Sequence, residues 1–184
     1  VMHKARTAIF DAHSTSKLTS RRLQAEPDDP KNPEKPYLKP PFLLNYLGVD
    51  SSYLADNSAN QEVYEALKQS FDPDDLKKFQ QKFNLVEKAA ISIGEQGHDV
   101  VGGCAGSNLN NCLEGTLDIQ YIMAVAQGSE TYYDYDSNYE HGWLVSWAQG
   151  LNAREEPISV ASISYGAPES AMSGPDLDSF ATEA

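Results

Sequence analysis

The sequence has little basic charge, few cysteines and no long apolar run, and each shortage excludes a class of protein. Lys and Arg number 14 among the 184 residues, against 27 Asp and Glu, which gives a formal net charge of −13. Without a basic patch to neutralise phosphates, we expect neither a nucleic-acid partner nor binding to an anionic membrane. No apolar segment is long enough to cross a bilayer. The acidity fits a protein that works in acid, although general solubility explains it equally well.

The two cysteines, Cys104 and Cys112, do not have the spacing of zinc ligands, and no second cysteine pair exists. We therefore assign no metal ligands in this chain. A local disulfide between them is the interpretation we favour, as in a secreted or lysosomal protein, and two free thiols are the alternative. The 40% hydrophobic content suffices for one domain with a real core.

The amino-terminal part differs in character from the rest. Residues 1–22 have little apolar periodicity, and residues 23–41 carry six prolines, which predicts an extended, semi-rigid linker. We expect the globular part to be residues 42–184. Because the sequence begins at Val1 and ends inside a helix predicted from about residue 174, we expect a processed chain with an unfinished fold.

Helix and strand patterns alternate along residues 42–184. Asp72 is a good N-cap before Pro73, which predicts a helix over residues 73–83, and a further helix is expected around residues 144–151. Strands are predicted at residues 88–94 and 157–166, while residues 60–69 favour helix with strand as the open alternative. This alternation predicts an α/β fold with a parallel sheet.

A further helix is predicted at residues 113–127, with an apolar face that includes Leu117 and Tyr121. The same helix carries Glu114 and Asp118, which a spacing of four places side by side. An acid pair near a helix start is often a solvated face that complements the helix dipole. If buried, the pair must share a proton, and one carboxylate can then act as a base in acid.

The segment EGTLDIQY around these acids resembles the catalytic helix of the sedolisin family of serine-carboxyl peptidases, E-[AG]-x-L-D-[IV]-Q-Y. Three further stretches resemble the family in the same order: SFDPDDLKKFQQKF, ISYGAPES and DSFATEA. The resemblance runs from about residue 41 to residue 184. It implies a subtilisin-like parallel sheet flanked by helices, of which this chain holds only the N-terminal portion.

The resemblance also implies roles for individual residues. Glu114 would be the general base that takes the proton of a serine nucleophile, and Asp118 would hold and polarise Glu114. Ser164, Tyr165 and Gly166 would pair with an extended peptide or protein substrate, unless they form an ordinary buried strand and turn. Such a site works best in acid, so we expect a lysosomal, vacuolar or secreted protein.

Three family features are missing from the sequence: the S-G-D loop with the oxyanion Asp, the G-T-S segment with the nucleophile, and the calcium site near the C-terminus. We expect the nucleophilic Ser on a second chain or C-terminal segment, and calcium bound outside this chain. Residues 1–22 would be the tail of the family's prodomain. The alternative function is a non-catalytic binding or structural module. A glycosidase fits poorly, because its two acids flank the sugar bond from opposite sides.

The segment ETYYDYDSNYEHGW is rich in tyrosine and acid. Asp134, Asp136 or Glu140 could hold the free amine of a substrate at the rim of the cleft. A solvated loop with scattered aromatic residues is the interpretation we favour.

Overall fold

The structure is a computed structural model that describes residues 38–50, 52–55, 59–137, 142–166 and 168–183. The chain divides into two units, Val1–Tyr37 and Leu38–Ala184, and the description below concerns the second. The predictions for residues 1–22, for most of the linker and for Glu140 lie outside the described residues. None of the helices in the described ranges combines the length and apolar character that a membrane span requires.

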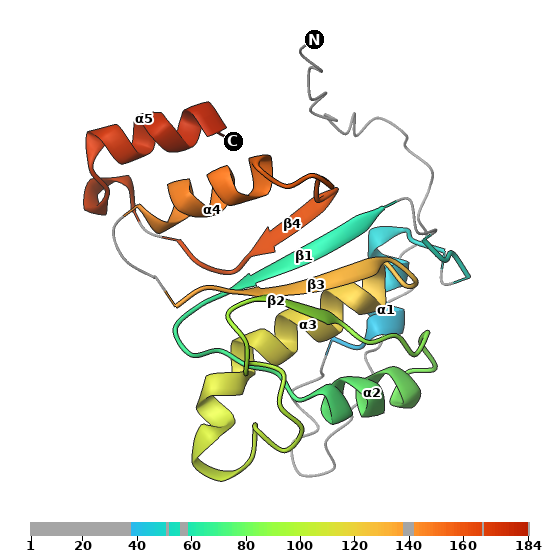
Figure 1. Ribbon diagram of the computed structural model, residues 1–184. Helices are drawn as coiled ribbons and strands as arrows, with labels where there is room; N and C mark the ends of the chain where they lie inside the picture. Colours follow the sequence, from blue (N-terminus) through green and yellow to red (C-terminus); the bar gives the residue numbers. More distant parts are fainter. Residues whose placement is uncertain (1–37, 51, 56–58, 138–141, 167, 184) are drawn as a thin grey trace. The chain divides into compact units, whose positions relative to one another are not determined.

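A four-stranded parallel sheet forms the centre of the described unit, which confirms the predicted α/β class (Figure 1). The spatial order of the strands is β2-β3-β1-β4. Val63 in β1 pairs with Tyr133 in β3 and with Ser162 in β4, so that β1 lies between two partners. The strands are β1 (Asn60–Glu65), β2 (Ile91–Gly94), β3 (Glu130–Tyr135) and β4 (Val160–Ile163).

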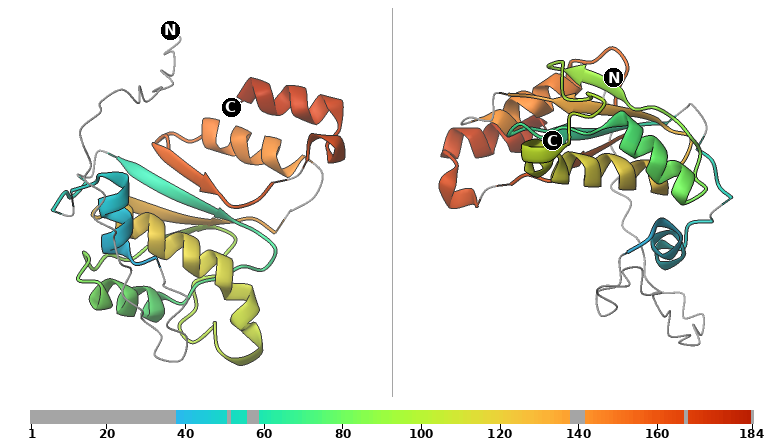
Figure 2. Two further views of the ribbon diagram at one scale, coloured as in Figure 1. Left: turned by 180° about the vertical axis from the view of Figure 1, so that it is seen from behind. Right: turned by 90° about the horizontal axis from the view of Figure 1, so that it is seen from below.

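Helices cover both faces of this sheet. Three of them lie on one face and two on the other, as the view from behind shows (Figure 2). The first group is α1 (Pro40–Leu47), α2 (Pro73–Lys82) and α3 (Leu113–Val125), and the second is α4 (Trp143–Asn152) and α5 (Gly174–Glu183). Two short 3-10 helices, η1 (Gly106–Cys112) and η2 (Glu169–Ala171), precede α3 and α5.

Each face of the sheet has its own hydrophobic core. Under α2 and α3, the core includes Val63, Ile119 and Tyr133, all fully buried. Under α4, Tyr64 stacks on Trp143 with ring centroids 5.3 Å apart. Because alternate residues of β1 point to opposite faces, this strand contributes to both cores.

Two strands differ from the sequence-based expectation. Residues 60–65 form β1 and not the favoured helix, and residues 130–135 form β3 and not a solvated loop. The favoured helix and the favoured loop were wrong, and the strand left open as the alternative for residues 60–69 is confirmed at residues 60–65, because burial by helices on the two faces outweighs the local preferences of Glu, Gln and Asp. The predicted strand at residues 157–166 is shorter, and Val160 of β4 is 59% exposed where a buried strand was expected.

The helix predictions agree better with the structure. Helix α2 begins at Pro73, and the Asp72 side chain accepts the backbone N–H of Asp74 at 2.9 Å. Helix α3 is present, but its buried residues include Ile119 and Met123, whereas Leu117 is 51% exposed. The predicted apolar face of α3 was therefore wrong: the side that meets the sheet is rotated away from Leu117.

Candidate active site

Helix α3 places Glu114 and Asp118 near the carboxyl ends of the strands, and the loop after β1 fixes where this helix begins. The Gln69 side-chain oxygen accepts the backbone N–H groups of Glu114 and Gly115 at 3.2 and 3.4 Å. These are two of the N–H groups that a helix start leaves without intrahelical partners. Gln69 thus acts as the cap of α3 and holds the first acid of the pair.

Asp118 is partly buried, and the Ser164 hydroxyl donates a hydrogen bond to one of its carboxylate oxygens. Burial raises the pKa of Asp118 above its ordinary value, and the negative charge of Glu114 raises it further, while the Ser164 bond opposes the shift. A proton on Asp118 is therefore held to a higher pH than on an isolated aspartate.

A third carboxyl, Glu65, lies at the end of β1 and is fully buried. Tyr165 donates its hydroxyl to Glu65 Oε2 at 2.8 Å. Burial raises the pKa of Glu65 to about 8, the Tyr165 bond opposes this shift, and the charges of Asp118 and Glu114 add to it. Sequence analysis missed this residue. The available signal was an acid at the end of the apolar run Val63-Tyr64, once that run is read as a strand.

The segment after β4 brings two predicted substrate residues to these acids. Ser164 contacts Asp118, and Tyr165 contacts Glu65 and accepts the backbone N–H of Ala66 at 3.1 Å. Gly166 is exposed, and a Cβ built on it would meet no atom within 4 Å. Two hydroxyls and three carboxyls therefore lie together at the carboxyl ends of the strands. The hydroxyls belong to Ser164 and Tyr165 after β4, and the carboxyls belong to Glu65 of β1 and to Glu114 and Asp118 of α3.

Other residues singled out from the sequence lie elsewhere. A disulfide joins Cys104 to Cys112, the residue directly before α3. Asp134 does not stand free at a cleft rim, since Arg154 donates to its carboxylate at 2.9 Å. Asp136 follows β3, and its backbone N–H donates to the Glu65 carbonyl at 2.9 Å.

Within the described ranges, no group of three or more His, Cys, Asp or Glu side chains could hold a metal ion. In the carboxyl cluster, Glu65 and Asp118 have raised pKa values and hydroxyl neighbours, as groups that take part in acid–base chemistry often do.

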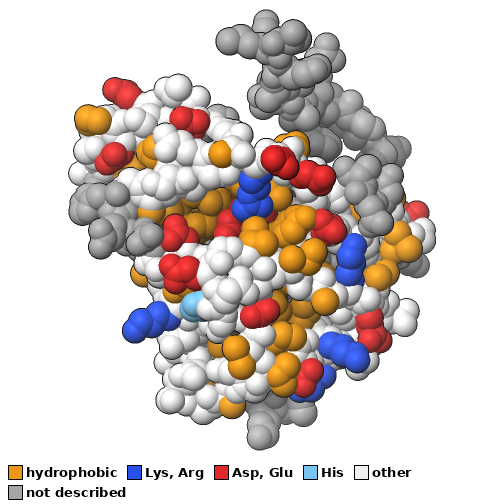
Figure 3. Space-filling view, in the orientation of Figure 1, with side chains coloured by type: hydrophobic (Ala, Val, Ile, Leu, Met, Phe, Trp, Pro, Cys, Tyr) orange, Lys and Arg blue, Asp and Glu red, His pale blue; other side chains and the backbone are white. Residues whose placement is uncertain are grey.

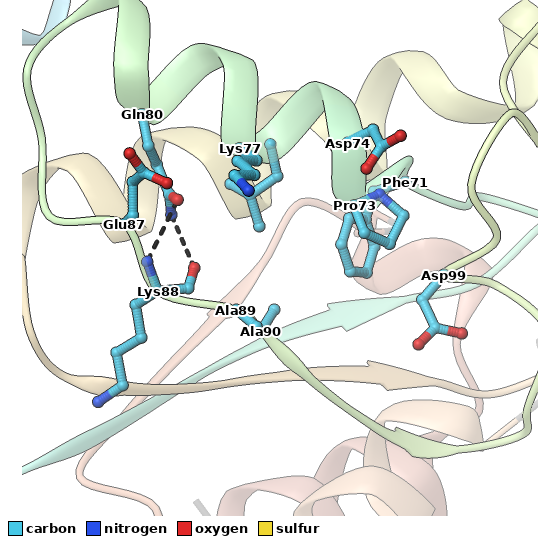
Figure 4. A pocket seen from close by; sticks show the side chains of 11 residues that line it. Phe71, Pro73, Asp74, Lys77, Gln80, Glu87, Lys88, Ala89, Ala90 and Asp99 are labelled. Atoms are coloured by element: carbon cyan, nitrogen blue, oxygen red, sulfur yellow. Dashed lines mark hydrogen bonds between the residues drawn. The ribbon is translucent and has the colours of Figure 1, made fainter.

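A cavity of about 350 Å³ lies between α2 and residues 87–90, and its lining contains none of the three clustered carboxyls (Figure 4). One wall is closed by Gln80, whose side chain donates to the Lys88 carbonyl at 2.8 Å and accepts the Lys88 N–H at 3.2 Å. The close-up shows no convergence of titratable groups on a common point, so this cavity is not the candidate active site.

Comparisons with known proteins indicate what the chain as a whole is similar to. No protein-family model matches the sequence. The chain is similar to tripeptidyl-peptidase 1 of Dictyostelium discoideum, with 32% identity over 154 residues. The alignment covers 80% of this chain and 24% of the relative. The chain therefore spans about a quarter of the length of the curated relative it matches, and it is a partial homologue of that protein.

Proposed function

We propose that the chain is part of an acid-acting peptidase of the sedolisin type, which hydrolyses peptide bonds with a Ser-Glu-Asp site. The observation that carries the proposal is the carboxyl cluster itself: Glu114 and Asp118 lie next to the buried Glu65, whose pKa burial raises to about 8. The similarity to tripeptidyl-peptidase 1 supports peptide substrates. A non-catalytic module gains nothing from keeping three acids together at this cost in desolvation.

In this proposal, Glu114 takes the proton from the nucleophilic serine hydroxyl as that oxygen attacks the peptide carbonyl. Asp118 lies one helical turn away, and its raised pKa lets it keep a proton in acid and donate a hydrogen bond to Glu114. Glu65 is protonated under these conditions, so it adds no third negative charge beside the pair. Gln69 and Ser164 orient the two acids through their hydrogen bonds.

The serine nucleophile and the oxyanion Asp belong, in this proposal, to a segment or chain outside the 184 residues, since neither S-G-D nor G-T-S occurs among them. The calcium site would lie in the same segment. Ser164, Tyr165 and Gly166 would present backbone groups to an extended substrate. Activity in acid places the protein in a lysosomal, vacuolar or secreted setting.

Replacing the base tests the proposal in the assembled protein that contains the serine segment. Glu114→Gln keeps the shape of the side chain but cannot accept the proton, so kcat/KM for a short peptide at acid pH should fall by about 100-fold or more. Asp118→Asn should also lower the rate. The matched control is Glu155→Gln, an exposed acid remote from the cluster, which should leave the rate unchanged. Unchanged turnover in Glu114→Gln with an unchanged melting temperature would overturn the mechanism.

A further inference from the structure

A polar cavity of about 310 Å³ lies beside the start of α3, and no carboxylate lines it. This is unusual in a chain with a net charge of −13, in which acidic side chains are spread over the surface (Figure 3). Its lining includes Lys68, Ser70, Gly97, Asn108, Asn111 and Cys112.

This cavity is a direct neighbour of the candidate base. Asn111 and Cys112 come immediately before α3, and Glu114 lies in the first turn of that helix. Lys68 and Ser70 also line the cavity, and Gln69, which lies between them in the sequence, accepts the backbone N–H of Glu114. A peptide held at Glu114 would therefore have a neighbouring group within reach of the cavity.

The cavity walls are tied together from both sides. The disulfide between Cys104 and Cys112 closes one wall, and the Asn111 carbonyl accepts the Ser70 N–H at 2.8 Å. His98 stacks on Tyr135 with ring centroids 3.3 Å apart, and its Nδ1 donates to the Gln69 carbonyl at 3.0 Å. A cavity held by a disulfide and several hydrogen bonds is formed before a ligand arrives, which lowers the entropic cost of binding.

Lys68 is held at this cavity in a strained backbone conformation. Leu67 and Lys68 have φ values of 53° and 68°, in the left-handed region that residues other than glycine rarely adopt. The Tyr135 hydroxyl accepts the Lys68 N–H at 2.9 Å and pins this turn. Such strain is often found at binding sites. Among the described residues, no carboxylate forms an ion pair with the Lys68 ammonium.

We propose that this cavity binds a carboxylate of the peptide substrate, with the Lys68 ammonium and the Asn108 and Asn111 amides as its hydrogen-bond donors. The inference rests on the proposed function, because it takes the ligand to be a peptide held at Glu114. The net negative charge of the protein repels acidic peptides in general, so a preference for them requires a local cation such as Lys68. The carboxylate can be an Asp or Glu side chain or the C-terminus of a short peptide.

The test measures binding and needs no catalysis. Dissociation constants are measured by fluorescence anisotropy at about pH 6, where an aspartate side chain is ionised. Three labelled peptides are compared: one with an internal Asp and an amidated C-terminus, the same peptide with Asn, and the Asn peptide with a free C-terminus. We expect one of the two carboxylate peptides to bind at least about threefold tighter than the neutral one, and the tighter peptide identifies the source.

Lys68→Glu should reverse this preference and Lys68→Gln should abolish it. The matched control is Lys82→Glu, which makes the same change of charge at an exposed position at the end of α2. It should preserve the ratio of the affinities for the carboxylate and neutral peptides. Equal affinities, no detectable binding, or equal effects of the Lys68 and Lys82 variants would overturn the inference. A preference that depends on Lys68, together with unchanged turnover in Glu114→Gln, would keep the cavity as a carboxylate site and refute only the proposed peptidase mechanism.

Discussion

The Glu65 carboxyl is fully buried, and Tyr165 is the side chain that bonds one of its oxygens. The other oxygen, Oε1, has no hydrogen-bond partner among the described protein atoms. Nearby charges are those of Asp118 and Glu114, which disfavour ionisation. The pKa of about 8 follows from this environment, so Glu65 is protonated in acid next to the Glu114 and Asp118 pair.

This proton makes the stability of the fold depend on pH. The folded pKa of Glu65 is about 8 and the ordinary value is 4.5, so the native state binds the proton more tightly than the unfolded state. Its stabilising contribution is complete below about pH 4.5 and is lost as the pH rises towards 8. Between pH 4.5 and 8, the unfolding free energy of the wild type should therefore fall by on the order of 4 kcal/mol through Glu65. Glu65→Gln should lack this fall, and urea unfolding measured across that pH range checks it.

Glu87→Gln, at an exposed position, is the matched control and should keep the slope of the wild type. If Glu65→Gln and the wild type lose the same unfolding free energy between pH 4.5 and 8, Glu65 is not protonated in the native state.

At the scale of elements, the approach of α3 to the sheet depends on one glycine. A Cβ on Gly115 would lie 2.3 Å from the Tyr133 hydroxyl and 2.9 Å from the Ser70 carbonyl oxygen. Since neither Tyr133 in the core nor the Ser70 backbone can move freely, a methyl group here must displace the start of α3. Glu114 is the residue before this contact, so the same displacement would move the candidate base.

Gly115→Ala should therefore lower the free energy of unfolding by about 1–3 kcal/mol, measured by urea denaturation. Tyr133→Phe in the same background removes the closest atom and should recover part of the loss. Gly150→Ala is the control, because this position in α4 has no atom within 4 Å of the added Cβ. It should stabilise the protein by about 0.5–1 kcal/mol through helix propensity. Equal effects of the two Gly→Ala changes would show that α3 is not closely packed at Gly115.

The elements that were predictable from sequence are those with local signals. The start of α2 can be predicted from Asp72 and Pro73, because an N-cap hydrogen bond and the fixed φ of proline involve only residues that are close in sequence. Strands β1 and β3 carry no such signal: Glu62 and Glu65 are buried, and Asp134 is partly buried, against partners that are distant in sequence. For the same reason the helical acid pair was found from its spacing, whereas Glu65, which reaches it from another element, was not.

At the scale of the whole described unit, Arg154, which follows α4, forms ion pairs with acids of two strands. Its guanidinium lies 2.8 Å from Glu62 of β1 and 2.9 Å from Asp134 of β3. Trp147 of α4 donates to the other Glu62 oxygen at 3.2 Å. Glu62 is fully buried, and burial raises the pKa values of both acids while Arg154 opposes the shifts. The ion pairs therefore offset a desolvation cost at the centre of the sheet.

Removing Arg154 should destabilise the protein in a way that depends on pH. In Arg154→Met, Glu62 and Asp134 lose the charge that lowers their pKa values, so at neutral pH the unfolding free energy should fall by about 3–5 kcal/mol. In acid both carboxyls take up protons, no uncompensated charge is buried, and the loss should be smaller. The control is Lys78→Met, which removes an exposed ion pair with Asp75 and should cost less than about 1 kcal/mol at either pH. A loss for Arg154→Met that is equal at both pH values would mean that packing of the side chain, and not its charge, holds α4 to the sheet.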